Sequence, residues 1–123
     1  MSKVIKINWL DEPEEHDYPA AASYLLLVFD GETVTKFLRK LRRAPISHFK
    51  AKDIFRASEL SLLGVSNSHV DKDRKKVSAG KKLSPLLLVR DHAKLRVIIA
   101  DGYHRMCAVY SFNEDAVIPC KIV

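Results

Sequence analysis

The feature that most constrains the fold is a change of hydrophobic period in the last third of the chain. Residues 83–89 and 95–100 are short apolar runs separated by the polar residues 90–94, a pattern typical of two strands and a turn. Residues 103–112 then have helical spacing, and residues 116–123 form a final apolar run. This order of strand, strand, helix and strand predicts a small mixed sheet with helices packed on it, an α/β or α+β fold.

The first part of the chain reads as helices. Residues 20–29 are strongly apolar, which predicts a buried helix. Asp30 is a candidate N-cap for a second helix that ends before Pro45. The apolar residues of that helix recur at helical spacing: Val34, Phe37, Leu38 and Leu41.

The middle of the chain is less clear. Residues 48–63 are ambiguous, with Ile54 and Phe55 as the expected anchors. A polar helix is predicted over residues 69–79, after N-cap candidates at residues 66–68, with Gly80 as its C-cap. Pro119 predicts that the last strand lies at a sheet edge or pairs on one side only.

Charge and cysteine content restrict the class of protein. The net charge is +6, with basic residues concentrated in 36–56 and 72–96 and acids in 11–17. Such a surface attracts phosphate-bearing partners, although many lysines simply keep a helix face solvated. No apolar run approaches the roughly 20 residues of a membrane helix, and the amino terminus does not resemble a signal peptide. Two cysteines without a CxxC motif indicate a reducing, cytoplasmic location, and a membrane partner is not expected.

The step from strand to helix at residues 101–105, Asp-Gly-Tyr-His-Arg, is the main candidate site. Gly102 allows a tight turn and a close approach of a ligand to the backbone. The first turn of the following helix has unpaired N–H groups that attract an anion. Arg105 could bind phosphate oxygens, His104 could donate a hydrogen bond or move a proton, and Asp101 could hold a metal ion or accept a proton. Lys82 could add a contact from a neighbouring loop.

Two other interpretations remain open. Asp101 and Gly102 could form only a tight turn, with His104 and Arg105 as exposed helix residues. Residues 59–77 also have some features of a helix-turn-helix, but Glu59 and Asp73 occupy positions that this motif normally buries. The histidines lack the spacing of metal ligands, so no metal site is predicted.

The strand-to-helix corner at residues 101–105 and its flanking strands resemble the ParB/sulfiredoxin superfamily. The resemblance rests on the strand–DGYHR–helix unit, the proline-led run SPLLLV at residues 84–89 and the final strand IPCKIV. It covers roughly residues 49–123. It therefore implies one domain, with residues 46–123 as a ParB/sulfiredoxin-like core and residues 1–45 as an added helical extension.

The resemblance implies a nucleotide site at the start of the helix. Sulfiredoxin has its catalytic cysteine where this chain has Tyr103, so sulfiredoxin chemistry is not expected. The free serine kinases of the superfamily have DGHHR, which is most similar to DGYHR. Their phosphate-binding role carries over to Gly102, His104 and Arg105, and Tyr103 is included as part of the same corner.

Other expectations follow from the same resemblance. Ser78 matches a family hydroxyl that touches phosphate, and the implied ligand is ATP, ADP or another nucleotide with Mg²⁺. The expected function is therefore nucleotide or phosphate binding, extending to phosphotransfer with Asp101 and His104 as catalytic residues. The alternatives are a non-enzymatic nucleotide-sensing or interaction module and a DNA-binding protein that uses its basic surface.

Overall fold

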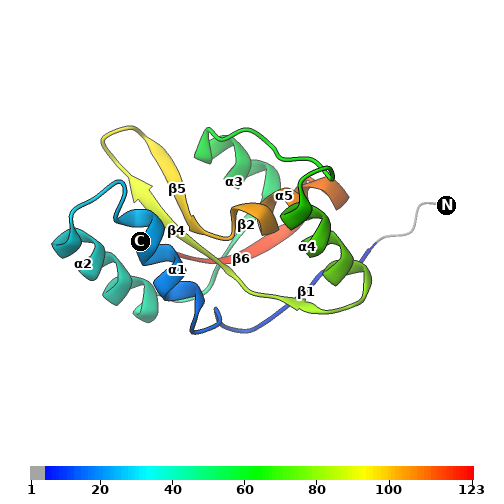
Figure 1. The fold of residues 1–123 in the computed structure, drawn as a ribbon, viewed down its shortest axis with the longest axis horizontal. Helices are drawn as coiled ribbons and strands as arrows, with labels where there is room; N and C mark the ends of the chain where they lie inside the picture. Colours follow the sequence, from blue (N-terminus) through cyan, green and yellow to red (C-terminus); the bar gives the residue numbers. More distant parts are fainter. Residues whose placement is uncertain (1–4) are drawn as a thin grey trace.

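The computed structural model describes residues 5–123, which contain five helices and two sheets (Figure 1). The helices are α1 (Asp17–Leu25), α2 (Gly31–Arg43), α3 (Ala51–Ser58), α4 (Ser68–Ser78) and α5 (Tyr103–Phe112). The strands are β1 (Asn8–Trp9), β2 (Ser47–Lys50), β3 (Lys82–Leu83), β4 (Leu86–Asp91), β5 (Arg96–Asp101) and β6 (Val117–Ile122). The structure confirms the expected combination of helices with a small mixed sheet.

The main sheet has the strand order β2–β6–β4–β5. The outer pairs β2–β6 and β4–β5 are antiparallel, whereas the central pair β4–β6 is parallel. A separate pair of two-residue strands, β1 and β3, is parallel. The main sheet is therefore mixed, and its two central strands come from the carboxyl-terminal third of the chain.

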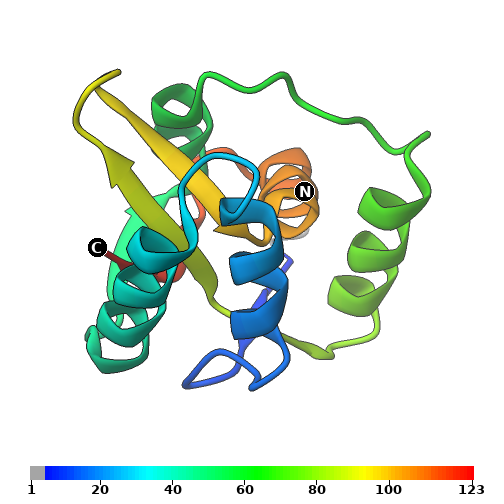
Figure 2. The same cartoon turned by 60° about the vertical axis from the view of Figure 1, so that its left-hand side comes forward.

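Helices cover both faces of this sheet, because successive residues of a strand point to opposite faces. In β4, Leu86 and Leu88 belong to the core formed with α3, α4 and α5, whereas Leu87 and Val89 belong to the core formed with α1 and α2. Figures 1 and 2 show the same division, with α1 and α2 on one side of the strands. The extension expected at residues 1–45 thus supplies, in its described part, a complete helical layer.

Several local predictions are confirmed. Asp30 caps α2, since its Oδ1 accepts a hydrogen bond from the backbone N–H of Thr33 at 2.8 Å. Asn67 caps α4 through the N–H groups of His69 and Val70. Helix α5 has the predicted bounds. These features depend on short-range sequence signals, which is why they were accessible without the structure.

The prediction for the last strand is wrong in its placement. β6 lies between β2 and β4 and is therefore a central strand. Pro119 is tolerated because the pairing with β4 begins only at the next residue, Cys120, so Pro119 itself pairs with β2 alone. The run predicted as one strand over residues 83–89 is also divided, into β3 and β4, around Ser84 and Pro85.

The apolar run at residues 20–29 does not form one buried helix. Helix α1 ends at Leu25, and the next residues, Leu26, Leu27 and Val28, are 54%, 84% and 44% exposed. Tyr24 is also 44% exposed. The helix-turn-helix interpretation is wrong as well, because nine residues separate α3 from α4, whereas that motif has a turn of three or four.

Candidate functional site

The corner between β5 and α5 has the geometry expected from its sequence. Asp101 ends β5, Tyr103 begins α5, and Gly102 between them has φ of 106°. A Cβ atom at Gly102 would lie 2.7 Å from Cγ of Leu86 and 2.9 Å from Nη2 of Arg105. Both the backbone conformation and the neighbouring atoms therefore require glycine at this position.

The first turn of α5 is uncapped. Gly102 has no side chain to accept hydrogen bonds, and the helical bonding begins with the N–H of Met106, which donates to the carbonyl oxygen of Gly102 at 2.9 Å. The first turn also contains no acidic residue. Its N–H groups and the positive end of the helix dipole are therefore available to an anion.

A polar cavity of about 180 Å³ adjoins this turn. Its lining residues come from α4 and from the corner: His69, Lys72, Asp73, Lys76, Asp101, Gly102, Tyr103, His104 and Arg105. Three of these side chains are cationic at neutral pH, namely Lys72, Lys76 and Arg105. Two are carboxylates, Asp73 and Asp101. The cavity thus combines a positive charge excess with the open end of a helix.

Helix α4 forms one wall of the cavity, and Lys72 and Lys76 carry the positive charge of this α4 wall. Val70 and Val77 are buried in the core, which fixes the rotation of α4 and turns the face that carries Lys72 and Lys76 toward the corner. Among residues 5–123 no carboxylate lies within ion-pair distance of either lysine, whereas the neighbouring Lys75 pairs with Asp71 at 3.1 Å. These two ammonium groups are thus free for a ligand.

His104 lies against His69 in the lining of the cavity. The ring centroids are 4.8 Å apart with an angle of 43° between the planes. Partial burial lowers the pKa of His104, and the neighbouring His69 lowers it further. His104 is therefore held in its neutral form at neutral pH, and a bound anion would favour its protonation.

Arg105 is less available than its sequence position indicates. Its Nη2 lies 2.8 Å from Oδ2 of Asp101, and both side chains are 17% exposed. Burial raises the pKa of Asp101, and the charge of Arg105 acts in the opposite direction. Nε of Arg105 is buried without a hydrogen-bond partner in the described part of the chain. The Nη2 atom of Arg105 is therefore engaged by Asp101, and only the rest of the guanidinium is left for a ligand.

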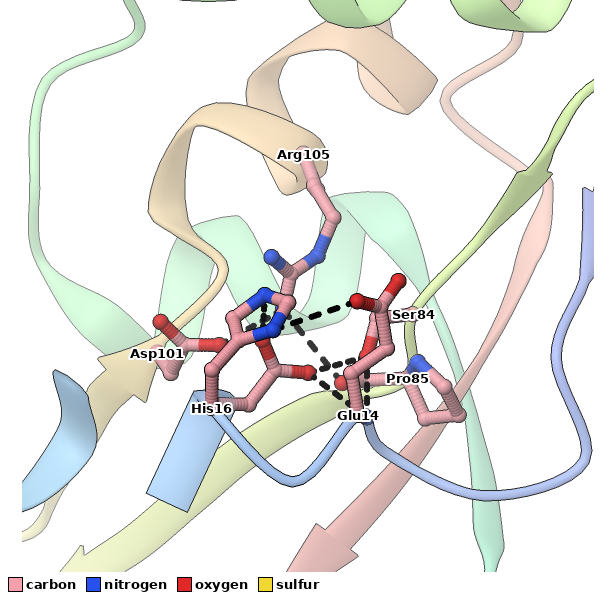
Figure 3. Close-up of polar contacts among 7 residues, drawn as sticks. Glu14, His16, Ser84, Pro85, Asp101 and Arg105 are labelled. Atoms are coloured by element: carbon pink, nitrogen blue, oxygen red, sulfur yellow. Dashed lines mark hydrogen bonds and ion pairs between the residues drawn. The ribbon is translucent and has the colours of Figure 1, made fainter. Parts of the chain in front are cut away.

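The segment before α1 lies beside this ion pair (Figure 3). Figure 3 shows Arg105 pointing from α5 toward the loop that carries Glu14 and His16. In that loop the N–H of Glu14 donates to Oδ2 of Asp17 and to Oγ of Ser84, each at 3.1 Å. Ser84 in turn donates to Asp17, which is only 3% exposed. A polar network thus fixes the N-terminal segment beside the corner.

The structure brings together most of the expected site residues. Asp101, Gly102, Tyr103, His104 and Arg105 all line the cavity. The Tyr103 hydroxyl donates to the carbonyl oxygen of Ser61 and so fastens the linker before α4. Ser78 and Lys82, the other two expected phosphate contacts, are exposed and do not line it.

Sequence reasoning did not identify the α4 contribution, His69, Lys72 and Lys76. These residues have the spacing i, i+3 and i+7, which places them on one helix face. Their spacing was therefore a usable signal, but it does not show which face of α4 meets the corner.

A second cavity, of about 230 Å³, lies elsewhere and has a different character. It is bounded by α3 and by one face of the sheet, and most of its lining is apolar, including Phe49, Leu88 and Ile122. It contains none of the corner residues. Its side chains offer an anion only Arg90, so this cavity lacks the chemistry expected for a phosphate site.

Residues 5–123 contain no cluster of three or more side chains able to hold a metal ion. Asp73 and Asp101 nevertheless both line the corner cavity. Mg²⁺ bound together with substrate phosphates commonly uses one or two carboxylates, so these residues meet that requirement in number.

Comparison with known proteins gives no relative: no family model, no curated protein and no solved structure matches the chain. The likeness to the ParB/sulfiredoxin superfamily therefore stays a prediction from the corner motif. Of the helices in residues 5–123, none has the length and apolar character needed to cross a membrane.

Proposed function

We propose that this chain binds a nucleotide or another phosphate-bearing small molecule in the corner cavity. The observation that carries the proposal is that two unpaired lysines on α4 face the uncapped first turn of α5 across one polar cavity. Lysine ammonium groups and open helix N–H groups both favour phosphate oxygens. Gly102 permits the sharp turn that presents this end of the helix, since its φ of 106° suits glycine.

The dimensions favour a small phosphate compound. Lys72 and Lys76 are one helical turn apart, about 6 Å along the axis, which suits two neighbouring phosphate groups. A cavity of about 180 Å³ accommodates a diphosphate group but not a nucleic-acid duplex. The base and ribose of a nucleotide would then extend from the open side of the cavity.

Phosphotransfer is the more specific form of the proposal, and it follows the likeness of DGYHR to the corner of the free serine kinases. His104 is held neutral and could accept a proton from an attacking hydroxyl group. Asp101 would be the weaker base of the two while it is paired, because the charge of Arg105 favours its ionised form. Mg²⁺ would neutralise phosphate charge when bound with the nucleotide.

The test uses variants of the α4 wall. Calorimetric titration with ATP, ADP, CTP and pyrophosphate, with and without Mg²⁺, should find at least one ligand for the parent protein. Lys72→Gln with Lys76→Gln should weaken that ligand about 100-fold, since two charge-assisted contacts contribute at least about 1.5 kcal/mol each. Lys75→Gln is the matched control, because Lys75 is on the same helix but outside the cavity.

Two results would contradict the proposal. One is the absence of binding by any of these ligands to the folded parent. The other is an equal loss of affinity in the Lys75→Gln control, which would indicate only long-range attraction. Transfer of labelled phosphate from the nucleotide to a hydroxyl acceptor would distinguish a phosphotransferase from a module that binds nucleotides without reacting.

A specific observation also favours a second candidate, nucleic-acid binding by α2. Four basic residues lie on one exposed face of this helix at the spacing i, i+3, i+4 and i+7: Lys36, Arg39, Lys40 and Arg43. Binding through them would weaken steeply with salt and show no sequence preference. Arg39→Glu with Lys40→Glu should abolish such binding in a gel shift and leave nucleotide affinity unchanged.

A further inference from the structure

The cavity of about 230 Å³ between α3 and the main sheet, called the α3 cavity below, is separate from the corner. Each of the four strands supplies one apolar side chain to its floor: Phe49, Leu88, Val97 and Ile122. These residues belong to the core on the face of the sheet that packs against α3, α4 and α5. The α3 cavity has no lining residue in common with the corner cavity.

The space is open because α3 presents a small side chain to this floor. Ile54 lines the α3 cavity and is 3% exposed. Ala57, which also lines it, lies three residues later and therefore on the same side of the helix. Its methyl group reaches less far toward the sheet than a longer side chain would, and α3 ends at the next residue, Ser58. The cavity thus depends on alanine at position 57 and on the short length of α3.

The size and lining of the α3 cavity suit a small apolar molecule. An apolar cavity of about 150 Å³ holds benzene, so about 230 Å³ holds about nine carbon atoms at the same density. Phe49, Val97 and Ile122 are only partly buried, so the cavity opens to solvent along its rim. Pockets of this kind bind apolar molecules and orient them through a few polar groups.

One such polar group is Arg90, which lines the α3 cavity and is exposed. The two acidic residues near it have other partners. Asp53, the carboxylate of the cavity lining, pairs with Arg56 at 3.5 Å. Asp91, which follows Arg90 in β4, pairs with Arg96 at 3.1 Å. Within residues 5–123 no carboxylate lies at ion-pair distance from Arg90, so its guanidinium group is available to an anion. The planar arrangement of its donors matches a carboxylate through two parallel hydrogen bonds.

We propose that the α3 cavity binds a small carboxylic acid with an apolar body of about nine carbon atoms. The apolar body lies on the floor beneath α3, and the carboxylate pairs with Arg90 at the rim. One guanidinium group beside Asp53 leaves little excess positive charge, which suits a single carboxylate and disfavours a phosphate or a dicarboxylate. An amine is disfavoured because Arg90 would repel it and Asp53 already has a partner.

The experiment is an NMR titration of the full chain with 3-phenylpropionate, whose carbon count fits the cavity, followed through backbone amide shifts. The parent should bind it with a Kd of about 1 mM or tighter, with the shifts concentrated at the lining residues. Arg90→Gln should weaken binding about 10-fold, because a charge-assisted contact is lost. Ala57→Leu should abolish saturable binding, since the longer side chain fills the cavity. Circular dichroism melts establish that each variant is folded.

Three controls make the result specific. Lys94→Gln removes the same charge in the turn between β4 and β5, outside the cavity, and should bind as the parent does. The neutral analogue 3-phenylpropan-1-ol should bind the parent about 10-fold more weakly than the acid does. Lys72→Gln with Lys76→Gln should leave acid binding unchanged, so failure of the corner site and failure of the α3 cavity are distinguishable.

Three outcomes would overturn this assignment. The first is the absence of saturable shifts at the lining residues of the parent. The second is unchanged binding in Ala57→Leu, which would place the acid elsewhere on the protein. The third is equal affinity for the acid and the alcohol, which would remove the role of Arg90.

Discussion

Replacement of Gly102 by alanine should destabilise the protein through two separable effects. The first is backbone strain, since φ of 106° costs an L-residue about 1–2 kcal/mol. The second is overpacking against Leu86, which is fully buried and has its Cγ 2.7 Å from the added Cβ; such contacts cost about 1–3 kcal/mol. The free energy of unfolding should therefore fall by about 2–5 kcal/mol.

This loss has a measurable size in a thermal melt. An unfolding entropy of about 2.1 cal/mol/K per residue makes each kcal/mol worth about 4 °C for a chain of 123 residues. The Gly102→Ala variant should thus melt about 8–20 °C below the parent by circular dichroism. Urea titration at 25 °C supplies the free energy independently.

Two other glycines separate the effects. Gly80 has φ of 73° but open space around its Cα, so Gly80→Ala should show the strain alone, about 1–2 kcal/mol. Gly31 has open space and no positive φ, so Gly31→Ala should be neutral or slightly stabilising in α2. If Gly102→Ala melted no lower than Gly80→Ala, the close approach of Leu86 to the corner would be refuted.

Three further predictions concern single side chains. Arg105→Ala should lower the free energy of unfolding by about 3 kcal/mol at pH 7, because it leaves the Asp101 carboxylate buried without its partner. The pKa of Asp101 is already raised, so its carboxyl group is protonated at acidic pH. Urea titration should therefore find a smaller loss at acidic pH than at pH 7. The lowered pKa of His104 leaves it neutral in the free protein, and a bound phosphate would favour its protonated form. Calorimetric affinity should therefore rise as pH falls below neutrality, and His104→Asn should lose this dependence. Burial raises the pKa of Cys107, and that of Cys120 to about 12, so neither thiol should react with a thiol reagent until the protein is denatured; fast reaction in the native state would contradict the packing.

The corner was predictable because its signals are local. The pair Asp101-Gly102 and the change from a strand pattern to a helical one lie within a few residues, so neighbouring side chains alone determine the bounds of α5. The same holds for the Asp30 cap. Such features require no knowledge of distant segments.

The rest of the site depends on contacts between distant segments. The cavity exists because Val70 and Val77 orient α4 against α5, and no local pattern shows which helix will be its neighbour. The contact of Asp17 with Ser84 joins residues 67 positions apart. β6 was misplaced for a related reason: a proline marks where a hydrogen bond is missing but not which strand lies on each side.

The central position of β6 has a consequence for how the chain acquires its structure. Every other strand of the main sheet is made before β6, yet β2 and β4 each pair with β6 and not with each other. A chain that ended at residue 115 would lack β6, so β2 would have no partner in the main sheet and β4 would have only β5. Closure of the core must await long-range pairing, which slows folding and leaves apolar surface uncovered in the meantime. The growing chain would need protection from aggregation during that interval.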